Sequence, residues 1–76
     1  MRWKETDHFL LQLRERAIPR ELVDMTLDSP DTIVDGPRSR RIYQKRFGDK
    51  MLRIITEGDT LITVYLTSKV RKYMEE

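Results

Sequence analysis

The sequence contains no cysteine, and it has one histidine, one tryptophan and three glycines. Without cysteine the chain forms no disulfide and offers no thiolate to a metal, and a single histidine cannot build a metal cluster. No tight spacing of Asp and Glu predicts a carboxylate site, so we expect neither a metal nor another cofactor. No apolar run approaches the ~18 residues of a membrane span, and no signal peptide opens the chain. We therefore expect a cytoplasmic protein without a membrane segment.

The chain is instead rich in charge, which is unevenly distributed. The net charge is only +2, but residues 1–37 hold five basic and eight acidic side chains (−3), whereas residues 38–76 hold ten basic and five acidic ones (+5). Seven cations and one acid lie within residues 38–53, interleaved with Tyr43 and Phe47. A basic surface with aromatic rings suits a phosphate backbone and a stacked base. A mixed, solubilising surface would have the same composition.

The apolar pattern predicts one α+β domain over residues 1–76. Apolar residues at helical spacing predict a first helix that begins at Thr6 or Asp7, and a second that begins at Pro19. A period of two then predicts four strands, the last two each preceded by a Gly-Asp turn, at residues 32–34, 41–47, 50–57 and 60–67. We expect two N-terminal helices packed on a four-stranded antiparallel β-meander. The tail from Ser68 can form a short C-terminal helix or stay loose.

Strand register decides which side chains share a face, and the sequence allows two registers. If both Gly-Asp turns are two-residue loops, Ile42, Ile55 and Ile62 align under the helices, and Tyr65 lies on the open face. If the second loop has three residues, Arg53 moves next to Tyr65 on the open face. Its neighbours Leu52 and Ile54 then turn inward. A slip of one residue flips the whole side-chain set of a strand. We favour the two-residue loops, although Arg53 then lies on the apolar face.

Basic and aromatic residues of the hairpin and the tail are the candidates for binding nucleic acid. Cations hold phosphates, and aromatic rings stack on bases. In the favoured register Arg41, Tyr43 and Lys45 share the open face with Tyr65. The alternative is a solvated strand edge that cations protect from aggregation, with the tyrosines in cross-strand packing. The candidate residues are Arg41, Tyr43, Lys45, Arg46 and Lys69.

Four other residues are candidates for chemistry at a phosphate. His8 lies in the first predicted helical turn, and an imidazole transfers protons near neutral pH. Arg16 and Arg53 can hold a phosphate, and Tyr65 can donate a hydrogen bond to one. Each has a structural alternative: an exposed histidine at a helix start, a charge at a helix end, a cation at a strand edge, and a packed tyrosine. The sequence alone leaves both interpretations open.

Short motifs are spread along nearly the whole chain. The main ones are His8, Arg16-Ala17-Ile18, Val23, Leu27, Ser29-Pro30-Asp31, Ile42-Tyr43, Leu52-Arg53-Ile54 and Thr63-Val64-Tyr65-Leu66-Thr67-Ser68-Lys69. These motifs resemble a family of small prokaryotic proteins of unknown function that is grouped with RelE and BrnT type toxins. The resemblance implies a compact RelE-like α+β fold. It also implies a metal-independent ribonuclease toxin that cleaves single-stranded or messenger RNA, often on the ribosome, and is neutralised by an antitoxin.

The resemblance also implies roles for single residues. In such enzymes the 2′-hydroxyl attacks the adjacent phosphorus, and basic groups stabilise the charge that develops. His8 would be the acid or base, Arg16 and Arg53 would contact the scissile phosphate, and Tyr65 would orient it.

Two positions depart from the family pattern. Gln12 stands where members often carry a basic residue, and Ala17 stands where a glycine is usual. A non-catalytic RNA-binding module remains an alternative, as does a protein-interaction domain that uses its sheet edge or basic tail. The sequence leaves the oligomeric state open.

Overall fold

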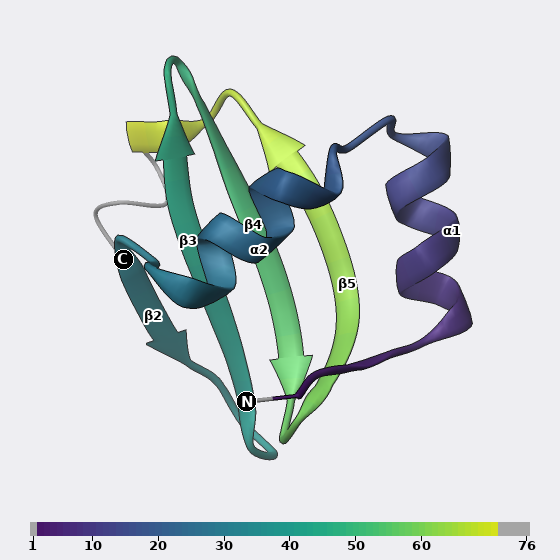
Figure 1. Cartoon of the computed structure of the whole chain (residues 1–76). Helices are drawn as coiled ribbons and strands as arrows, with labels where there is room; N and C mark the ends of the chain where they lie inside the picture. The colour runs from purple at the N-terminus through teal and green to yellow at the C-terminus, as the bar shows by residue number, and fades with distance from the viewer. Residues whose placement is uncertain (1, 72–76) are drawn as a thin grey trace.

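A computed structural model describes residues 2–71 of the chain. Two helices, α1 (Asp7–Glu15) and α2 (Arg20–Asp28), pack against one sheet in which the strands are ordered β1-β5-β4-β3-β2. Figure 1 shows α2 crossing one face of the sheet, whereas α1 lies beside β5. The α+β class is therefore confirmed. The strands are β1 (Lys4–Glu5), β2 (Thr32–Asp35), β3 (Arg40–Phe47), β4 (Lys50–Glu57) and β5 (Thr60–Thr67).

The predicted four-stranded antiparallel meander is wrong, because the sheet has five strands and is mixed. β1 runs parallel to β5, with Lys4 opposite Thr60. The Lys4 N–H donates to the Asp59 carbonyl at 2.8 Å, and the Thr6 hydroxyl donates to the Leu61 carbonyl at 3.0 Å. Both side chains of β1 are exposed, so this two-residue strand is held by its backbone. It leaves no alternation of apolar and polar residues from which a strand could be predicted.

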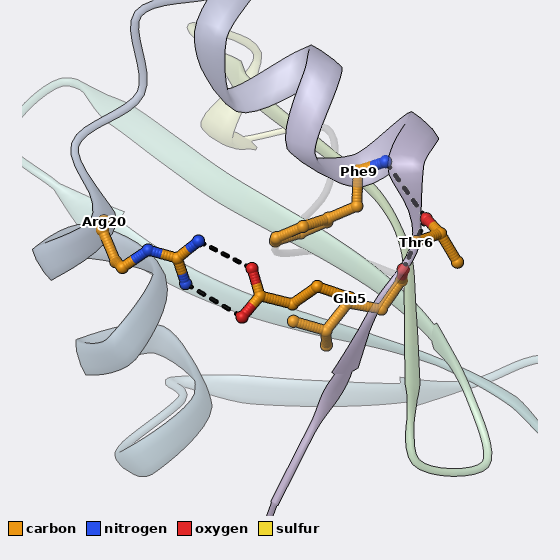
Figure 2. Close-up of polar contacts among 5 residues, drawn as sticks. Glu5, Thr6, Phe9 and Arg20 are labelled. Atoms are coloured by element: carbon orange, nitrogen blue, oxygen red, sulfur yellow. Dashed lines mark hydrogen bonds and ion pairs between the residues drawn. The ribbon is translucent and has the colours of Figure 1, made fainter.

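Specific backbone contacts fix both ends of α1. Figure 2 shows the Thr6 Oγ1 accepting a hydrogen bond from the Phe9 N–H, at 3.1 Å, which confirms one of the two predicted caps. At the other end Ala17 has a left-handed backbone with φ 49°, and the Ile18 N–H donates to the Leu13 carbonyl at 3.0 Å. This is the Schellman pattern, in which glycine is the usual residue. The site of Ala17 thus favours the glycine that is usual in the resembled family.

Both Gly-Asp turns are two-residue loops, as predicted. Phe47 pairs with Lys50 across the first turn, and the residues that flank the second turn pair in the same way. Gly48 and Gly58 have φ values of 64° and 60°, which a type II′ turn requires at its first central position.

A β-bulge in β5 overturns the favoured register beyond the second turn. The partner of β4 skips Ile62, so that Arg53 lies opposite Tyr65. Leu52 and Ile54 are fully buried toward the helices, as the alternative register predicted. An extra residue in one strand reverses the faces of all residues after it, which is why a two-residue turn did not determine the whole pairing.

The two faces of the sheet are defined by this register. The inner face packs against the helices, and Trp3 and Tyr43 pack at the margin of its apolar cluster. The outer face carries Arg53 and Tyr65, and the paired residues Ile42 and Ile55 lie on the same face. The prediction that Ile42 and Ile55 lie under the helices is therefore wrong. The buried apolar cluster consists of Phe9, Leu13, Ile18, Val23, Leu52, Ile54, Leu61 and Val64.

The chain turns onto the outer side of the sheet after β5. Residues 68–71 pass behind the sheet in Figure 1, on the side opposite α2. Val70 and Arg71 are helical, and the rest of the predicted C-terminal helix lies outside the described residues. Across residues 2–71, neither helix is long and apolar enough to cross a membrane.

Candidate nucleic-acid interface

An aromatic pair lies at one end of the inner face. The centroids of the Trp3 and Tyr43 rings are 5.5 Å apart, and the ring planes are nearly perpendicular, at 83°. Tyr43 is placed by β3, where it lies between Ile33 of β2 and Ile54 of β4. Trp3 is placed by the backbone pairing of the adjoining β1 with β5. Both rings are half-buried, so each keeps an exposed part.

A hollow of about 430 Å³ opens beside this pair, and we call it the basic hollow. Its walls are formed by Trp3, Tyr43, Arg40, Arg41 and Asp35, and by parts of the β2–β3 and β4–β5 turns. Arg41 and Tyr43 are predicted nucleic-acid-binding residues, and the structure brings these two together. The hollow therefore combines aromatic surface with positive charge, which are the two features that single-stranded nucleic acids recognise.

The β2–β3 turn beside the basic hollow has a strained backbone. Arg38 and Ser39 both have positive φ, at 59° and 62°, and the Arg40 N–H donates to the Pro37 carbonyl at 3.1 Å. Two successive left-handed residues define a type I′ turn, which strongly favours Asn-Gly. A left-handed conformation costs roughly 1–2 kcal/mol for a residue with a side chain. The turn thus carries an arginine at a position where the fold alone favours another residue.

The arginines around the hollow differ in their partners. The side chains of Arg38 and Arg40 are exposed, and neither forms an ion pair within residues 2–71. Arg41 Nε lies 3.1 Å from Asp35 Oδ1, with both side chains more than half exposed. Exposed ion pairs contribute about 0–1 kcal/mol, so a phosphate can compete for Arg41. Three arginines and Asp35 therefore lie at this end of the sheet, where Glu57 is the cross-strand partner of Arg40.

Two other predicted nucleic-acid-binding residues already have partners elsewhere. Lys45 Nζ donates to the Ser29 carbonyl at 2.8 Å and lies 3.7 Å from Asp31 Oδ1, so it neutralises the C-terminal end of α2. Arg46 lies on the outer face, where its Nε donates to the Gly48 carbonyl at 2.9 Å. These two residues do not join the basic hollow.

Lys69 lies beyond β5 with an exposed side chain. Its backbone N–H donates to Thr67 Oγ1 at 3.1 Å. No contact in the described part of the chain joins Lys69 to the basic hollow.

Arg53 and Tyr65 form a second cluster, in the middle of the outer face. Arg53 Nη1 donates to Tyr65 Oη at 2.6 Å, and the guanidinium lies 5.7 Å from the ring centroid. Gln44 and Thr32 continue the same row across β3 and β2, and Gln44 Nε2 donates to Thr32 Oγ1 at 2.8 Å. Arg53 is 5% exposed and Gln44 fully buried. Because these residues are buried, the middle of the outer face is not open. The prediction that Arg41, Tyr43 and Lys45 share an open face with Tyr65 is wrong. Those three residues lie on the inner face, on the same side as Leu52 and Ile54, which turn toward the helices, whereas Tyr65 lies on the outer face.

The remaining two predicted catalytic residues lie on α1, beside the edge of β5. Arg16 Nη1 donates to the Val64 carbonyl at 2.6 Å, and Gln12 Oε1 accepts from the Val64 N–H at 3.0 Å. These two side chains thus replace a neighbouring strand at this part of the edge. The His8 side chain is exposed and makes no hydrogen bond or ion pair with the described residues. It lies eight residues before Arg16, roughly 12 Å along a helix axis, so the structure does not bring the two together.

A second hollow, of about 480 Å³, is also lined by Trp3 and Tyr43, and we call it the acidic hollow. Its other walls come from α2, with Leu27 and the carboxylates of Asp24 and Asp28. Neither carboxylate forms an ion pair within residues 2–71. The aromatic pair is therefore shared by two hollows of opposite charge.

Sequence reasoning missed three residues of the interface. Trp3 packs at the margin of the apolar cluster, and it also lines both hollows. Arg38 and Arg40 were counted as cations without a role. The signal for them is the Pro37-Arg38-Ser39-Arg40 turn, since two arginines on a tight turn cannot both be packed in a core. No comparable signal predicts the place of Trp3, because β1 is not visible in the sequence pattern.

This arrangement defines a small α+β protein with a basic, aromatic-lined hollow at one end of a mixed sheet. Residues 6–66 match the model of a family described as a domain of unknown function, DUF4258. Because that match covers most of the chain, the protein belongs to this family. No curated protein and no solved structure matches the chain.

Proposed function

We propose that this protein binds RNA, with the phosphate backbone held by Arg38, Arg40 and Arg41 at the basic hollow. The observation that supports this most directly is the hollow itself, in which Arg40 and Arg41 adjoin two half-buried rings and only Arg41 has a carboxylate, Asp35, as its ion-pair partner within residues 2–71. We place the protein in the cytoplasm with its RNA, as an inference from this function.

The chemistry of arginine fits this role. Its planar guanidinium binds phosphate oxygens bidentately. A guanidinium is also more weakly hydrated than an ammonium group, so it loses less hydration energy when it binds a phosphate. The strained Arg38-Ser39 turn supports the same conclusion, because strain at an exposed turn persists where a side chain serves something other than the fold. Asp35 opposes binding, but its exposed pair with Arg41 is weak and exchangeable.

The test is RNA affinity as a function of salt. Each phosphate contact on a single strand contributes about 0.7 to the slope of log K against log salt. We expect the double variant Arg38→Gln/Arg40→Gln to bind more weakly and to lower the slope by about 1.4 over about 50–200 mM salt. Arg14→Gln/Lys50→Gln is the matched control, since it removes the same charge from two exposed cations outside the hollow. Equal losses in both double variants would refute the assignment.

A second candidate function is the metal-independent ribonuclease toxin, neutralised by an antitoxin, that the RelE and BrnT type resemblance implies. The observation that favours it is the 2.6 Å contact between Arg53 and Tyr65, which the β-bulge creates. Gln44 Oε1 is buried beside them with no hydrogen-bond partner among the described residues, and it can accept a bond from a 2′-hydroxyl. Arg53 would stabilise the negative charge on the phosphorane. Substrate reaches this row only if the outer face opens.

The second candidate is tested by incubating the protein with end-labelled RNA and a chelator, with and without ribosomes. Attack by a 2′-hydroxyl leaves a 2′,3′-cyclic phosphate, so the ends of the products identify the mechanism. Tyr65→Phe keeps the ring and removes only the hydroxyl that contacts Arg53, and it should reduce cleavage strongly. Absence of cleavage in all these conditions would remove the enzyme and leave RNA binding in place.

A further inference from the structure

We infer that the basic hollow receives one unpaired nucleotide of RNA, whose base stacks on the Trp3–Tyr43 pair. This rests on the proposed RNA binding and adds the class of RNA, which is single-stranded. It also assigns a binding role to Trp3, which otherwise serves only as a packing residue.

The position of the rings excludes a duplex. Trp3 and Tyr43 are half-buried and form part of the wall of a hollow, together with Arg40 and Arg41. The bases of a double helix are stacked inside it, and the major groove of A-form RNA is too deep and narrow for these protein rings to reach the bases. A base reaches the rings only after it leaves its stack, which costs least in a strand that is already unpaired.

The size and charge of the site limit it to one nucleotide. A volume of about 430 Å³ is at the lower end of small-ligand pockets. Beyond the same two rings lies the acidic hollow, where Asp24 and Asp28 repel a second phosphate. The backbone of the strand therefore runs along the β2–β3 turn, over Arg38 and Arg40, and does not continue across α2.

The stacking surface is held in place before RNA binds. Tyr43 is fixed in β3 between two paired strands, and Trp3 meets it edge to face at 5.5 Å. The Lys4 N–H bond to the Asp59 carbonyl anchors the backbone next to Trp3. Rings that are already ordered lose little conformational entropy when a ligand binds.

Trp3 is the single tryptophan of the chain, so its fluorescence reports on this site alone. We would titrate the full chain with a short single-stranded RNA of mixed sequence, with the same strand without its bases, and with the blunt duplex of that sequence. The single strand should quench Trp3 emission. The base-free strand should bind about tenfold more weakly without quenching, because stacking is worth ~1–3 kcal/mol per base. The duplex should leave the emission unchanged.

The outcomes separate this inference from the proposed function. Binding of single strand and duplex with equal affinity, without a change in Trp3 emission, overturns the inference and leaves RNA binding intact. Binding of each RNA is also measured by the fluorescence anisotropy of labelled RNA. If no RNA binds by this measure, both the inference and the proposed RNA binding are overturned. As a check on the protein side, Trp3→Leu should weaken binding of the single strand about tenfold. Leu10→Ala changes an exposed apolar residue of α1 that lines neither hollow, and this variant should bind as the wild type does. Circular dichroism shows whether each variant is folded.

Discussion

The middle of the outer face and the basic hollow place the same residue type in opposite environments. Arg53 is buried and bonded to Tyr65, whereas Arg40 is exposed at the turn, without an ion pair in the described part of the chain. The buried arginine is held by the sheet, so its removal should affect the fold first. The exposed arginine has no ion-pair partner within residues 2–71, so its removal should affect binding first. Burial and partners, and not charge alone, separate the two roles.

The comparison also shows how one extra residue redistributes charge. Ile62 forms the bulge, and every residue of β5 after it faces the side opposite to that of a regular hairpin. Tyr65 therefore joins Arg53 on the outer face, while Tyr43 remains on the inner face with Trp3. A set of cations and rings that is continuous in the sequence is thus divided between two surfaces.

The largest effect is expected from Arg53→Ala. The change removes a 95%-buried side chain and leaves the Tyr65 hydroxyl without the 2.6 Å donor. We expect the free energy of unfolding to fall by about 3 kcal/mol, from lost packing and lost hydrogen bonding together. Urea denaturation followed by circular dichroism measures this.

The control for that experiment is Arg40→Ala, which removes an exposed arginine from the adjoining strand β3. Surface substitutions stay within about 0.5 kcal/mol, so its unfolding midpoint should match that of the wild type. If Arg53→Ala is as stable as Arg40→Ala, the outer face does not hold Arg53 for structural reasons, and the contrast between the two regions fails.

A change of opposite sign is expected at the strained turn. Arg38→Asn places in the left-handed region a residue that tolerates it, and should stabilise the fold by about 1 kcal/mol. The same change removes a proposed phosphate contact and should weaken RNA binding. Ser39→Gly relieves strain in the same turn without removing a cation, so it should be stabilising and leave RNA affinity unchanged. Thermal melts and salt-dependent titrations together separate these effects.

Most of the fold could be predicted from the sequence, because most elements carry their own signals. Thr6 caps α1, and the two Gly-Asp turns set their loops, so the helices and strands β2 to β5 follow from local pattern. β1 and the bulge at Ile62 do not follow, since a two-residue strand has no periodicity and a bulge has no residue preference strong enough to predict it. Both depend on tertiary pairing with β5.

Less of the candidate site could be predicted, for the same physical reason. Arg41 and Tyr43 were identified correctly as neighbours on one face, because they are close in one strand and that strand carries no bulge. That face was predicted to be open, but it is the inner face, because Leu52 and Ile54 of β4 turn the same side of the sheet toward the helices. Trp3 was not linked to them, because its place depends on β1. The contact between Arg53 and Tyr65 appeared only as an alternative, because it depends on the bulge.

The smallest effect is expected at the ion pair between β1 and α2. Figure 2 shows both nitrogens of the Arg20 fork on the two oxygens of Glu5, at 2.6 and 3.1 Å. The pKa of Arg20 is raised above its ordinary value, chiefly by this hydrogen bond, while burial opposes the shift. A base whose pKa is raised by folding contributes its full stabilisation at any pH below its pKa in the unfolded chain. That stabilisation is lost only as the pH rises through the pKa in the folded protein. Both pKa values of Arg20 lie above the range from about pH 6 to about pH 9, so Arg20 does not titrate there.

Arg20→Gln should therefore lower the free energy of unfolding by only about 0.5 kcal/mol, and by the same amount across that pH range. The loss should shrink at high salt, because the side chains of Arg20 and Glu5 are 49% and 30% exposed. Urea unfolding at several pH values and two salt concentrations measures both features. A loss as large as that of Arg53→Ala would mean that an exposed ion pair stabilises this fold as much as a buried, hydrogen-bonded arginine does. Burial would then no longer separate structural from binding arginines.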